Sequence, residues 1–296
     1  MTPARSAARD VVLLTDIGMD IDDQWALAHL VLSPRVRLLA IVTSHAANLP
    51  APAAEVTAAA ARDVLRHLSP GYHIPVIAGS SLPVGSDGSA LGADLLIALS
   101  RRHSRSDRLA VLLIGPATDL ALALRGDPAL ADRIEVAAMG FKRWPRGGNS
   151  WNVRQDVRAW QEVVASRAPL TIGCDALCVR DLSLTVAAAA ARIGSRGPRG
   201  AYLANLLAEN LKRNGPREAT RLSGRPDAWP IWDEVVVAHL LGLTRAITTS
   251  RPPLADDQQF TPPLRAEGPG APRALTWITA VDAAALWSDL GLLIAR

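Results

Sequence analysis

The segment that most constrains this chain is Val11–Leu27, which reads VVLLTDIGMDIDDQWAL. It begins with an uninterrupted apolar run, Val11–Leu14, and a helical apolar pattern begins at Trp25. Aliphatic runs that end in Asp and Gly are typical of a buried parallel strand that passes into a loop. The segment therefore predicts a strand, a loop and a helix at the start of an α/β fold.

Four acids lie between this strand and this helix: Asp16, Asp20, Asp22 and Asp23. Carboxylates this close together repel one another unless positive charge lies among them. A helix N-terminus relieves part of the repulsion, and a hard divalent cation such as Ca²⁺ relieves more. Because α/β sheets bind ligands at the carboxyl ends of their strands, the cluster predicts a metal site. The alternative is an N-capped helix with solvated acids.

Further aliphatic runs alternate with Ala-rich or amphipathic segments. The expected strands are Val36–Thr43, Ile74–Ala78, Leu109–Ile114, Ile134–Met139 and Pro169–Ile172, and the expected helices are Ala53–Leu68, Ala90–His103, Thr118–Arg125 and Val157–Ser166. This alternation predicts βαβ units with right-handed crossovers. We therefore expect an α/β fold with a mostly parallel, open, Rossmann-like central sheet and helices on both faces.

The remaining segments are less regular. Helices are expected at Ala201–Asn214, Ile231–Leu241 and Asp282–Leu290, and short strands at Ala246–Thr249 and Leu275–Thr279. Phe141–Trp151 (FKRWPRGGNSW) predicts a long loop of the kind that carries function. Gly194–Gly200 predicts a flexible connection, and Arg217–Pro230 is polar and contains Pro and Gly. No repeat or domain break is evident, so we expect a tail at residues 1–10 and one domain at residues 11–296.

The composition restricts the class of function. The pI is 9.7, but the net charge is only +4, and the arginines are scattered rather than clustered as nucleic-acid binding requires. No uncharged apolar run is long enough to span a membrane, and the N-terminal residues are too polar and too few for a secretory signal. Cys174 and Cys178 do not suggest a disulfide framework. We expect two buried structural cysteines in a cytoplasmic protein.

Several polar residues follow the expected strands or begin the expected helices. They are Asp16 with Asp22 and Asp23, Asn48, Thr118, Asn152 and Asp233. The carboxyl ends of parallel strands lie along one edge of a sheet. We therefore expect these residues, distant in sequence, to converge at that edge.

At these positions the chain resembles the inosine–uridine-preferring nucleoside hydrolase family. That family opens with a strand followed by D-x-D-P-G-x-D-D, and Leu14–Asp23 reads LTDIGMDIDD here. The resemblance continues in GPATDLALALRGDP (Gly115–Pro128), AAMG (Ala137–Gly140) and GGNSWNVRQDVRAW (Gly147–Trp160). It runs from about residue 11 to residue 174 and reappears at residues 231–237.

The resemblance implies a Ca²⁺ site and hydrolysis of ribosides. Asp16 matches a metal-binding acid that also serves as general base, Asp23 a bidentate metal ligand, and Asp233 a metal ligand from late in the chain. Thr118 matches a residue whose backbone carbonyl binds the metal. Carboxylates near the sugar suit an N-glycosidic bond, because it breaks with oxocarbenium character. A water bound to Ca²⁺ also yields its proton more readily to a base such as Asp16.

The same resemblance implies substrate contacts. Asp22 matches an acid that grips the ribose hydroxyls, and Asn152 matches a ribose-binding asparagine. Asn48 lies close to the position of a further asparagine near the ribose. Ser150 stands where the family has a glutamate that holds the 5′-hydroxyl of the sugar. Asn149 or Ser150 is expected to compensate in part, and selectivity at the 5′ position is expected to differ.

Three further positions depart from the family pattern. Leu14 replaces an acid that supports the metal site from behind, so the order of the site is expected to be weaker. Two extra residues separate Gly18 from Asp22, as in a variant branch with a TDIGxDxDD motif, and the added Asp20 is expected to be a solvated loop acid. Trp232 stands where a histidine often assists the leaving base. A tryptophan stacks on a base but cannot protonate it.

Aromatic residues and histidines near the site are further candidates. Four tryptophans are expected to flank the pocket, at least one of them stacking on the leaving base: Trp144, Trp151, Trp229 and Trp232. Trp25 and Trp160 are expected in the core or at a subunit interface. His45 is the candidate acid for the leaving group. The ordinary helix residues are expected to be His29, His67, His103 and His239.

The leading hypothesis is therefore Ca²⁺-dependent hydrolysis of a ribonucleoside or related N-riboside, releasing base and ribose in nucleoside salvage. The enzyme is expected to be a cytoplasmic homodimer or homotetramer without nucleic-acid or membrane partners. One alternative is a non-hydrolytic nucleoside or sugar binder on the same scaffold. The other is an aspartate-dependent phosphatase, which needs positive charge near the phosphate, and neither Lys142 nor Lys212 is obviously placed to supply it. The base selected is not specified by these patterns.

Overall fold

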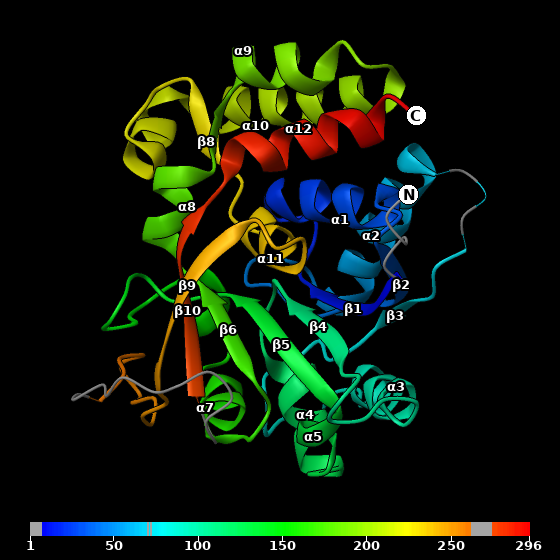
Figure 1. The fold of residues 1–296 in the computed structure, drawn as a ribbon, viewed down its shortest axis with the longest axis vertical. Helices are drawn as coiled ribbons and strands as arrows, with labels where there is room; N and C mark the ends of the chain where they lie inside the picture. Colours follow the sequence, from blue (N-terminus) through cyan, green and yellow to red (C-terminus); the bar gives the residue numbers. More distant parts are fainter. Residues whose placement is uncertain (1–7, 70, 72, 262–273) are drawn as a thin grey trace, which may run out of the picture.

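The computed structural model describes residues 8–69, 71, 73–261 and 274–296. Within these residues an eight-stranded sheet has the order β3-β2-β1-β4-β5-β6-β10-β9 (Figure 1). All neighbouring strands are parallel except β9, which runs antiparallel to β10. The strands are β1 (Arg9–Thr15), β2 (Val36–Thr43), β3 (Val76–Ala78), β4 (Leu109–Leu113), β5 (Ile134–Met139), β6 (Leu170–Gly173), β9 (Thr244–Ser250) and β10 (Ala274–Val281). The expected α/β class with a mostly parallel sheet is confirmed, whereas residues 1–7 of the expected tail lie outside the described residues.

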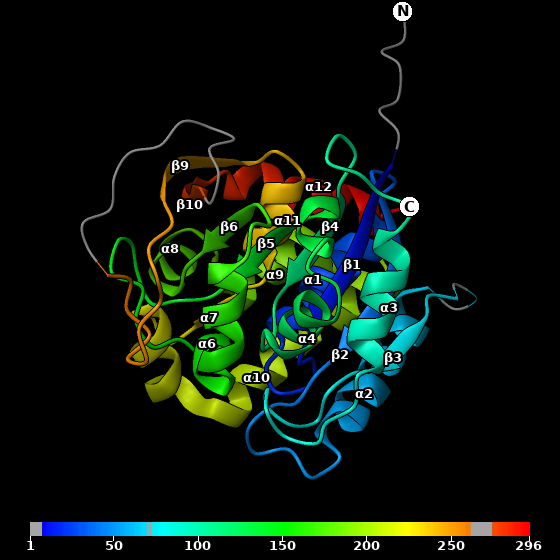
Figure 2. The ribbon, with the colours of Figure 1, turned by 90° about the horizontal axis from the view of Figure 1, so that it is seen from below.

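Helices cover both faces of this sheet (Figures 1 and 2). In Figure 1, α1, α11 and α12 lie on one side of it, and α3, α4 and α7 lie on the other. The helices are α1 (Asp22–Leu32), α2 (Ala53–Leu68), α3 (Leu91–Ser100), α4 (Thr118–Gly126), α5 (Leu130–Arg133), α6 (Trp151–Gln155), α7 (Val157–Ala165), α8 (Asp175–Asp181), α9 (Val186–Ala189), α10 (Pro198–Ser223), α11 (Glu234–Leu240) and α12 (Ala283–Ile294). No helix in the described part of the chain is both long and apolar enough to cross a membrane.

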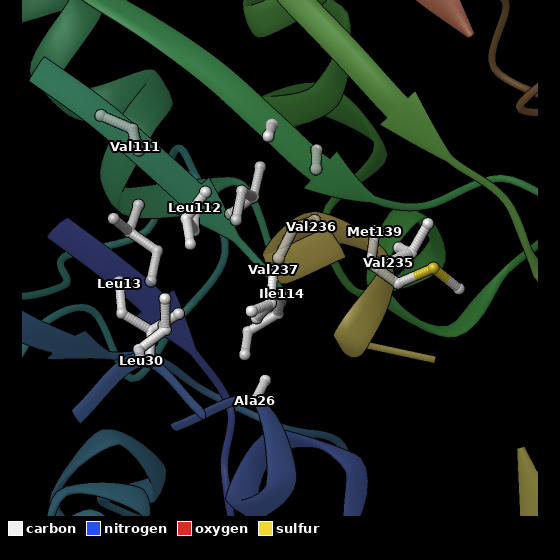
Figure 3. Packing of buried hydrophobic residues seen from close by; sticks show 14 of the residues in the cluster. Leu13, Ala26, Leu30, Val111, Leu112, Ile114, Met139, Val235, Val236 and Val237 are labelled. Carbon is white, nitrogen blue, oxygen red and sulfur yellow. The ribbon is translucent and has the colours of Figure 1, made fainter. Parts of the chain in front are cut away.

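The core fixes the helix that carries a late site residue. Figure 3 shows side chains of β1, α1 and β4 packed around α11, which contributes Val235, Val236 and Val237. These three valines are fully buried, and each contributes about 1.5–3 kcal/mol by leaving water. Because apolar residues occupy successive positions of α11, the helix is surrounded by protein rather than solvent. Asp233 at its N-cap is therefore held rigidly against the sheet edge.

Several expectations about local structure are confirmed. β2, α2 and β5 have the expected bounds, and the side chain of Asp282 caps α12 by accepting a hydrogen bond from the Ala285 amide. Cys174 and Cys178 are both free and buried. Trp25 and Trp160 are fully buried, which places both in the core.

The segment before α11 is more regular than the sequence suggests. α10 begins at Pro198, inside the expected flexible connection, after a π-helical turn at Ala190–Gly194. It also continues past Asn214 to Ser223, across a break at Gly215, whose φ is 79°. Pro216 follows that break, and proline is tolerated at the first turn of a helix because no intrahelical N–H bond is required there. A separate two-stranded sheet pairs β7 (Ser183–Thr185) with β8 (Ala228–Pro230), which the sequence patterns did not predict.

Candidate active site

Residues from three distant parts of the chain line one cavity of about 550 Å³ at the carboxyl edge of the sheet. Asp16 directly follows β1, Asp22 and Asp23 begin α1, and Asp233 is the N-cap residue of α11. All four carboxylates are almost fully buried. The predicted convergence of early and late acids at this edge is therefore present in the fold.

Three of these acids form a tight group. One carboxylate oxygen of each of Asp22, Asp23 and Asp233 lies within 4.8 Å of the others. Burial, followed by repulsion from neighbouring acids, raises the pKa of all three well above the ordinary value. Burial also raises the pKa of Asp16 to about 7, although a hydrogen bond from Trp151 opposes the shift.

No cationic side chain among the described residues forms an ion pair with these four acids. Among the ion pairs within the described ranges, none includes Asp16, Asp22, Asp23 or Asp233. Buried carboxylates without a partner are strongly destabilising. An all-oxygen set of this kind suits a hard divalent cation such as Ca²⁺ or Mg²⁺. The donor set therefore fits a bound divalent metal ion.

The backbone around the acids is shaped by two glycines and a threonine. Gly115 follows β4, and a Cβ atom there would lie 2.8 Å from the Asp16 backbone nitrogen, so only glycine allows β1 and β4 to approach so closely. Gly18 has φ 114°, a conformation that turns the chain between β1 and α1. The Thr15 hydroxyl donates a hydrogen bond to Asp23 and accepts one from the Ile17 amide at 3.1 Å. Thr15 thus supports Asp23 from the position beside buried Leu14.

The loop after β5 supplies the opposite wall. The indole nitrogen of Trp151 donates a hydrogen bond to Asp16 Oδ2 at 3.1 Å. The Asn152 side-chain nitrogen donates to the backbone oxygens of Ile114 at 2.8 Å and Met139 at 3.2 Å, at the ends of β4 and β5. Ser150 Oγ accepts a bond from the Phe141 amide at 2.7 Å and closes the base of the loop. All three residues line the cavity, as does exposed Asn149.

The expectation that Asp20 is a solvated loop acid is wrong. Its carboxylate accepts hydrogen bonds from Trp229 Nε1 at 3.0 Å, from Asn210 Nδ2 at 3.3 Å and from the Ile21 amide at 2.7 Å. Burial is the largest influence on its pKa and raises it. Asp20 therefore joins the loop after β1 to α10 and β8, which lie far along the chain.

Three of the four expected tryptophans line the cavity. They are Trp151, Trp229 and Trp232. Trp229 and Trp232 pack edge to face with ring centroids 6.4 Å apart, and the buried Trp232 Nε1 has no hydrogen-bond partner among the described residues. Trp144 instead packs against Trp277 at 5.1 Å, away from the cavity lining, so its expected place at the pocket is wrong.

Other expected site residues lie outside the cavity lining. Asn48 is exposed, with φ 73°, in the loop after β2. Thr118 is buried at the start of α4, and its hydroxyl donates to Asp156 Oδ2 at 2.7 Å and contacts His45 Nε2 at 3.0 Å. His45 is thus hydrogen-bonded to Thr118, and burial lowers its pKa. The roles assigned to Asn48, His45 and the Thr118 carbonyl stay predictions.

Sequence patterns did not reveal several groups around the acids. His29, expected to be an ordinary helix residue, is fully buried on α1 and lies 2.9 Å from Glu234 on α11 and 3.1 Å from Asp289 on α12. Asp175 on α8 and Asn210 on α10 line the cavity itself, which His29 does not. Each depends on a partner far away in sequence, so no local signal marks it.

Comparisons with known proteins agree with this geometry. The model of the inosine-uridine preferring nucleoside hydrolase family matches residues 11–287. Among solved structures, a plant nucleoside hydrolase is similar at 18% identity and TM-score 0.75, covering 97% of this chain and 99% of that one. A purine-preferring ribonucleoside hydrolase from Gardnerella vaginalis is similar at 17% identity and TM-score 0.77, with the same coverage. An inosine–uridine preferring nucleoside hydrolase from Bacillus anthracis is similar at 16% identity and TM-score 0.67, again covering 97% and 99%. None of the curated proteins matches.

Proposed function

This chain belongs to the inosine–uridine preferring nucleoside hydrolase family, which hydrolyses the N-glycosidic bond of nucleosides, and from that premise we propose how its own residues act. The substrate is a ribonucleoside or related N-riboside, with Ca²⁺ as cofactor and Asp16 as general base. Asp23, Asp233, Asp16 and the Thr118 carbonyl would hold the ion. The observation that carries this proposal is the buried acid cluster, which forms no ion pair with any described cationic side chain.

When bound, the ion would orient a water molecule and the sugar hydroxyls and make that water more acidic. Asp16 would then accept the proton of the attacking water, with Trp151 holding Oδ2 and leaving the other oxygen free for that proton. Asp22 and Asn152 would hold the ribose hydroxyls. The carboxylates would stabilise positive charge that develops on the sugar.

The leaving base would lie between the cavity tryptophans. Trp232 and Trp229 offer aromatic surface beside Asp233, and the buried, unpartnered Trp232 N–H would donate to a ring nitrogen or oxygen of the base once its indole turns towards the cavity. A donor of this kind stabilises the departing base without transferring a full proton. This chemistry suits bases that leave readily.

A panel of purine and pyrimidine ribosides, assayed for free base with Ca²⁺ and with a chelator, tests the proposal. We expect turnover that needs the cation, and loss of at least about a thousandfold in kcat for Asp16→Asn with binding retained. Full activity in Asp16→Asn would refute the base assignment. Binding without turnover would favour the non-hydrolytic binder, and release of inorganic phosphate from a phosphate ester would favour the phosphatase.

A further inference from the structure

The cavity that holds the acid cluster is also lined by four cationic side chains: Lys142, Arg154, Arg213 and Arg221. Two of them are already neutralised. Lys142 Nζ lies 3.1 Å from Asp175 Oδ2, and Arg221 pairs with Glu218 on the same helix. Arg154 and Arg213 form no ion pair with any described residue, although both face a cavity rich in acids.

Arg154 is held in a defined position. Its guanidinium carbon lies 4.4 Å from the centroid of the Trp151 ring, a cation–π contact that orients the planar group. The same indole donates to Asp16. One aromatic side chain therefore joins the proposed general base to an arginine whose N–H donors have no carboxylate partner.

Arg213 approaches from a different element. It lies on α10 between Asn210 and Asn214, which line the same cavity, and Asn210 donates to Asp20. The charge of Arg213 acts on Asp20 without forming an ion pair, and it opposes the rise of that pKa. Two unpaired guanidinium groups, from α6 and α10, thus border one cavity.

We propose that this cavity selects ribosides that carry an anionic substituent, with Arg154 and Arg213 binding that group. The proposal rests on the proposed function. A neutral nucleoside offers a guanidinium fork only neutral acceptors, whereas phosphate and carboxylate match its geometry with paired, charge-assisted hydrogen bonds. The acid cluster would repel an anion, so a substrate of this kind needs cationic groups at the cavity wall. The anion is either a phosphate on the 5′-hydroxyl or a carboxylate on the base.

Two matched substrate pairs distinguish these sources. The first is inosine and inosine 5′-monophosphate, and the second is uridine and its 6-carboxylate, orotidine. For the Ca²⁺-loaded enzyme we expect kcat/KM to favour the anionic member of one pair by roughly tenfold or more, the effect of one charge-assisted hydrogen bond. In Arg154→Gln and Arg213→Gln this ratio is expected to fall by about tenfold. Arg158→Gln and Arg217→Gln, exposed positions on α7 and α10 outside the cavity lining, serve as controls and are expected to keep it.

Binding of reaction products separates this proposal from the assignment of activity. Ribose 5-phosphate against ribose, and orotate against uracil, are measured by calorimetry on the same proteins, and neither comparison requires turnover. Tighter binding of one anionic product, lost in the two cavity variants, supports the proposal even if no riboside is hydrolysed; that result would reject only the proposed function. Equal or weaker binding and turnover of both anionic compounds would overturn it. So would equal loss for neutral and anionic compounds in the cavity variants, because the arginines would then only balance the acids.

Discussion

Asp23 is the residue at which the geometry of the metal site can be tested most directly. Its carboxylate contacts the Thr15 hydroxyl and lies within 4.8 Å of Asp22 and Asp233. Ca²⁺ is bound by six to eight oxygen ligands, and Asp23→Ala removes one of the protein's contributions to that set. We expect calcium affinity, measured by calorimetry, to fall by at least about a hundredfold.

Asp20→Asn is the matched control for that experiment. Asp20 lies on the same loop, but its oxygens accept bonds from Trp229 and Asn210 rather than pointing into the acid group. The control is expected to bind calcium within a few-fold of the wild type. Wild-type calcium affinity in Asp23→Ala, or equal loss in both variants, would contradict the assignment of Asp23 as a ligand.

His29 lies beneath the site and is expected to make stability depend on pH. Burial lowers its pKa, but the carboxylates of Glu234 and Asp289 outweigh burial and raise the pKa to about 9. The unfolded value is near 6.5. Because the pKa of His29 is higher in the folded state, its protonation stabilises the fold fully below pH ~6.5, and this contribution is lost as the pH rises through about 9. A shift of this size corresponds to roughly 3 kcal/mol.

We expect the free energy of unfolding, followed by urea denaturation, to fall by roughly that amount between pH ~6.5 and ~9.5. In His29→Gln the protein should be less stable at pH 6.5, and this decline should be largely absent. His67→Gln, an exposed position on α2, should keep the wild-type profile. An identical pH dependence in His29→Gln would show that the histidine is not charged in the folded state.

At the scale of elements, the close approach of β4 to β1 places Asp16. In Gly115→Ala the new Cβ would lie 2.8 Å from the Asp16 nitrogen and 2.9 Å from the Thr15 carbonyl carbon, and backbone atoms cannot move aside as a flexible side chain can. We expect a loss of about 1–3 kcal/mol in the free energy of unfolding. A decrease in kcat should exceed any change in KM, because Asp16 is displaced.

Gly126→Ala tests whether that effect is local. Gly126 ends α4, and its nearest neighbour is the tip of the Ile97 side chain at 3.2 Å. This change is expected to leave stability within about 1 kcal/mol of the wild type. Equal effects of the two substitutions on kcat would contradict a specific role for Gly115.

The helices and strands also show which parts of the fold are determined by local sequence. β2, α2 and β5 match their expected bounds because aliphatic runs and helical periodicity are local signals. The β7–β8 pair and the helical turns after Gly215 were not predicted, because short polar segments adopt structure only through distant contacts. The convergence of early acids with Asp233 was predictable from the rule that parallel strands end at one edge. The partners of Asp20, the packing of Trp144 and the orientation of Arg154 were not, because each depends on a residue far away in sequence.

At the scale of the whole molecule, the acid cluster connects parts of the chain that are otherwise held by core packing. Asp22 and Asp23 begin α1 and Asp233 is the N-cap residue of α11, so a cation bound among them would link two elements far apart in sequence, and the proposed ligand Asp16 would add β1. Unfolding separates these carboxylates and destroys the site. Ligand that binds only the folded state therefore adds stability according to its concentration relative to the dissociation constant.

Thermal unfolding with Ca²⁺ and with a chelator measures this link independently of activity. At a calcium concentration about a hundred times the dissociation constant, the gain is about 2.7 kcal/mol, which for a chain of this length corresponds to an increase in Tm of roughly 4–5 °C. The chelated protein should remain folded at 25 °C, because the core of the sheet and α11 does not include the cluster.

The variant Asp23→Ala should show no calcium-dependent shift in Tm. It should also be more stable than the chelated wild type, because removing one buried carboxylate relieves repulsion on Asp22 and Asp233. An unchanged Tm on chelation would mean that the acids share protons instead of a cation, and the metal assignment would fail together with the mechanism built on it.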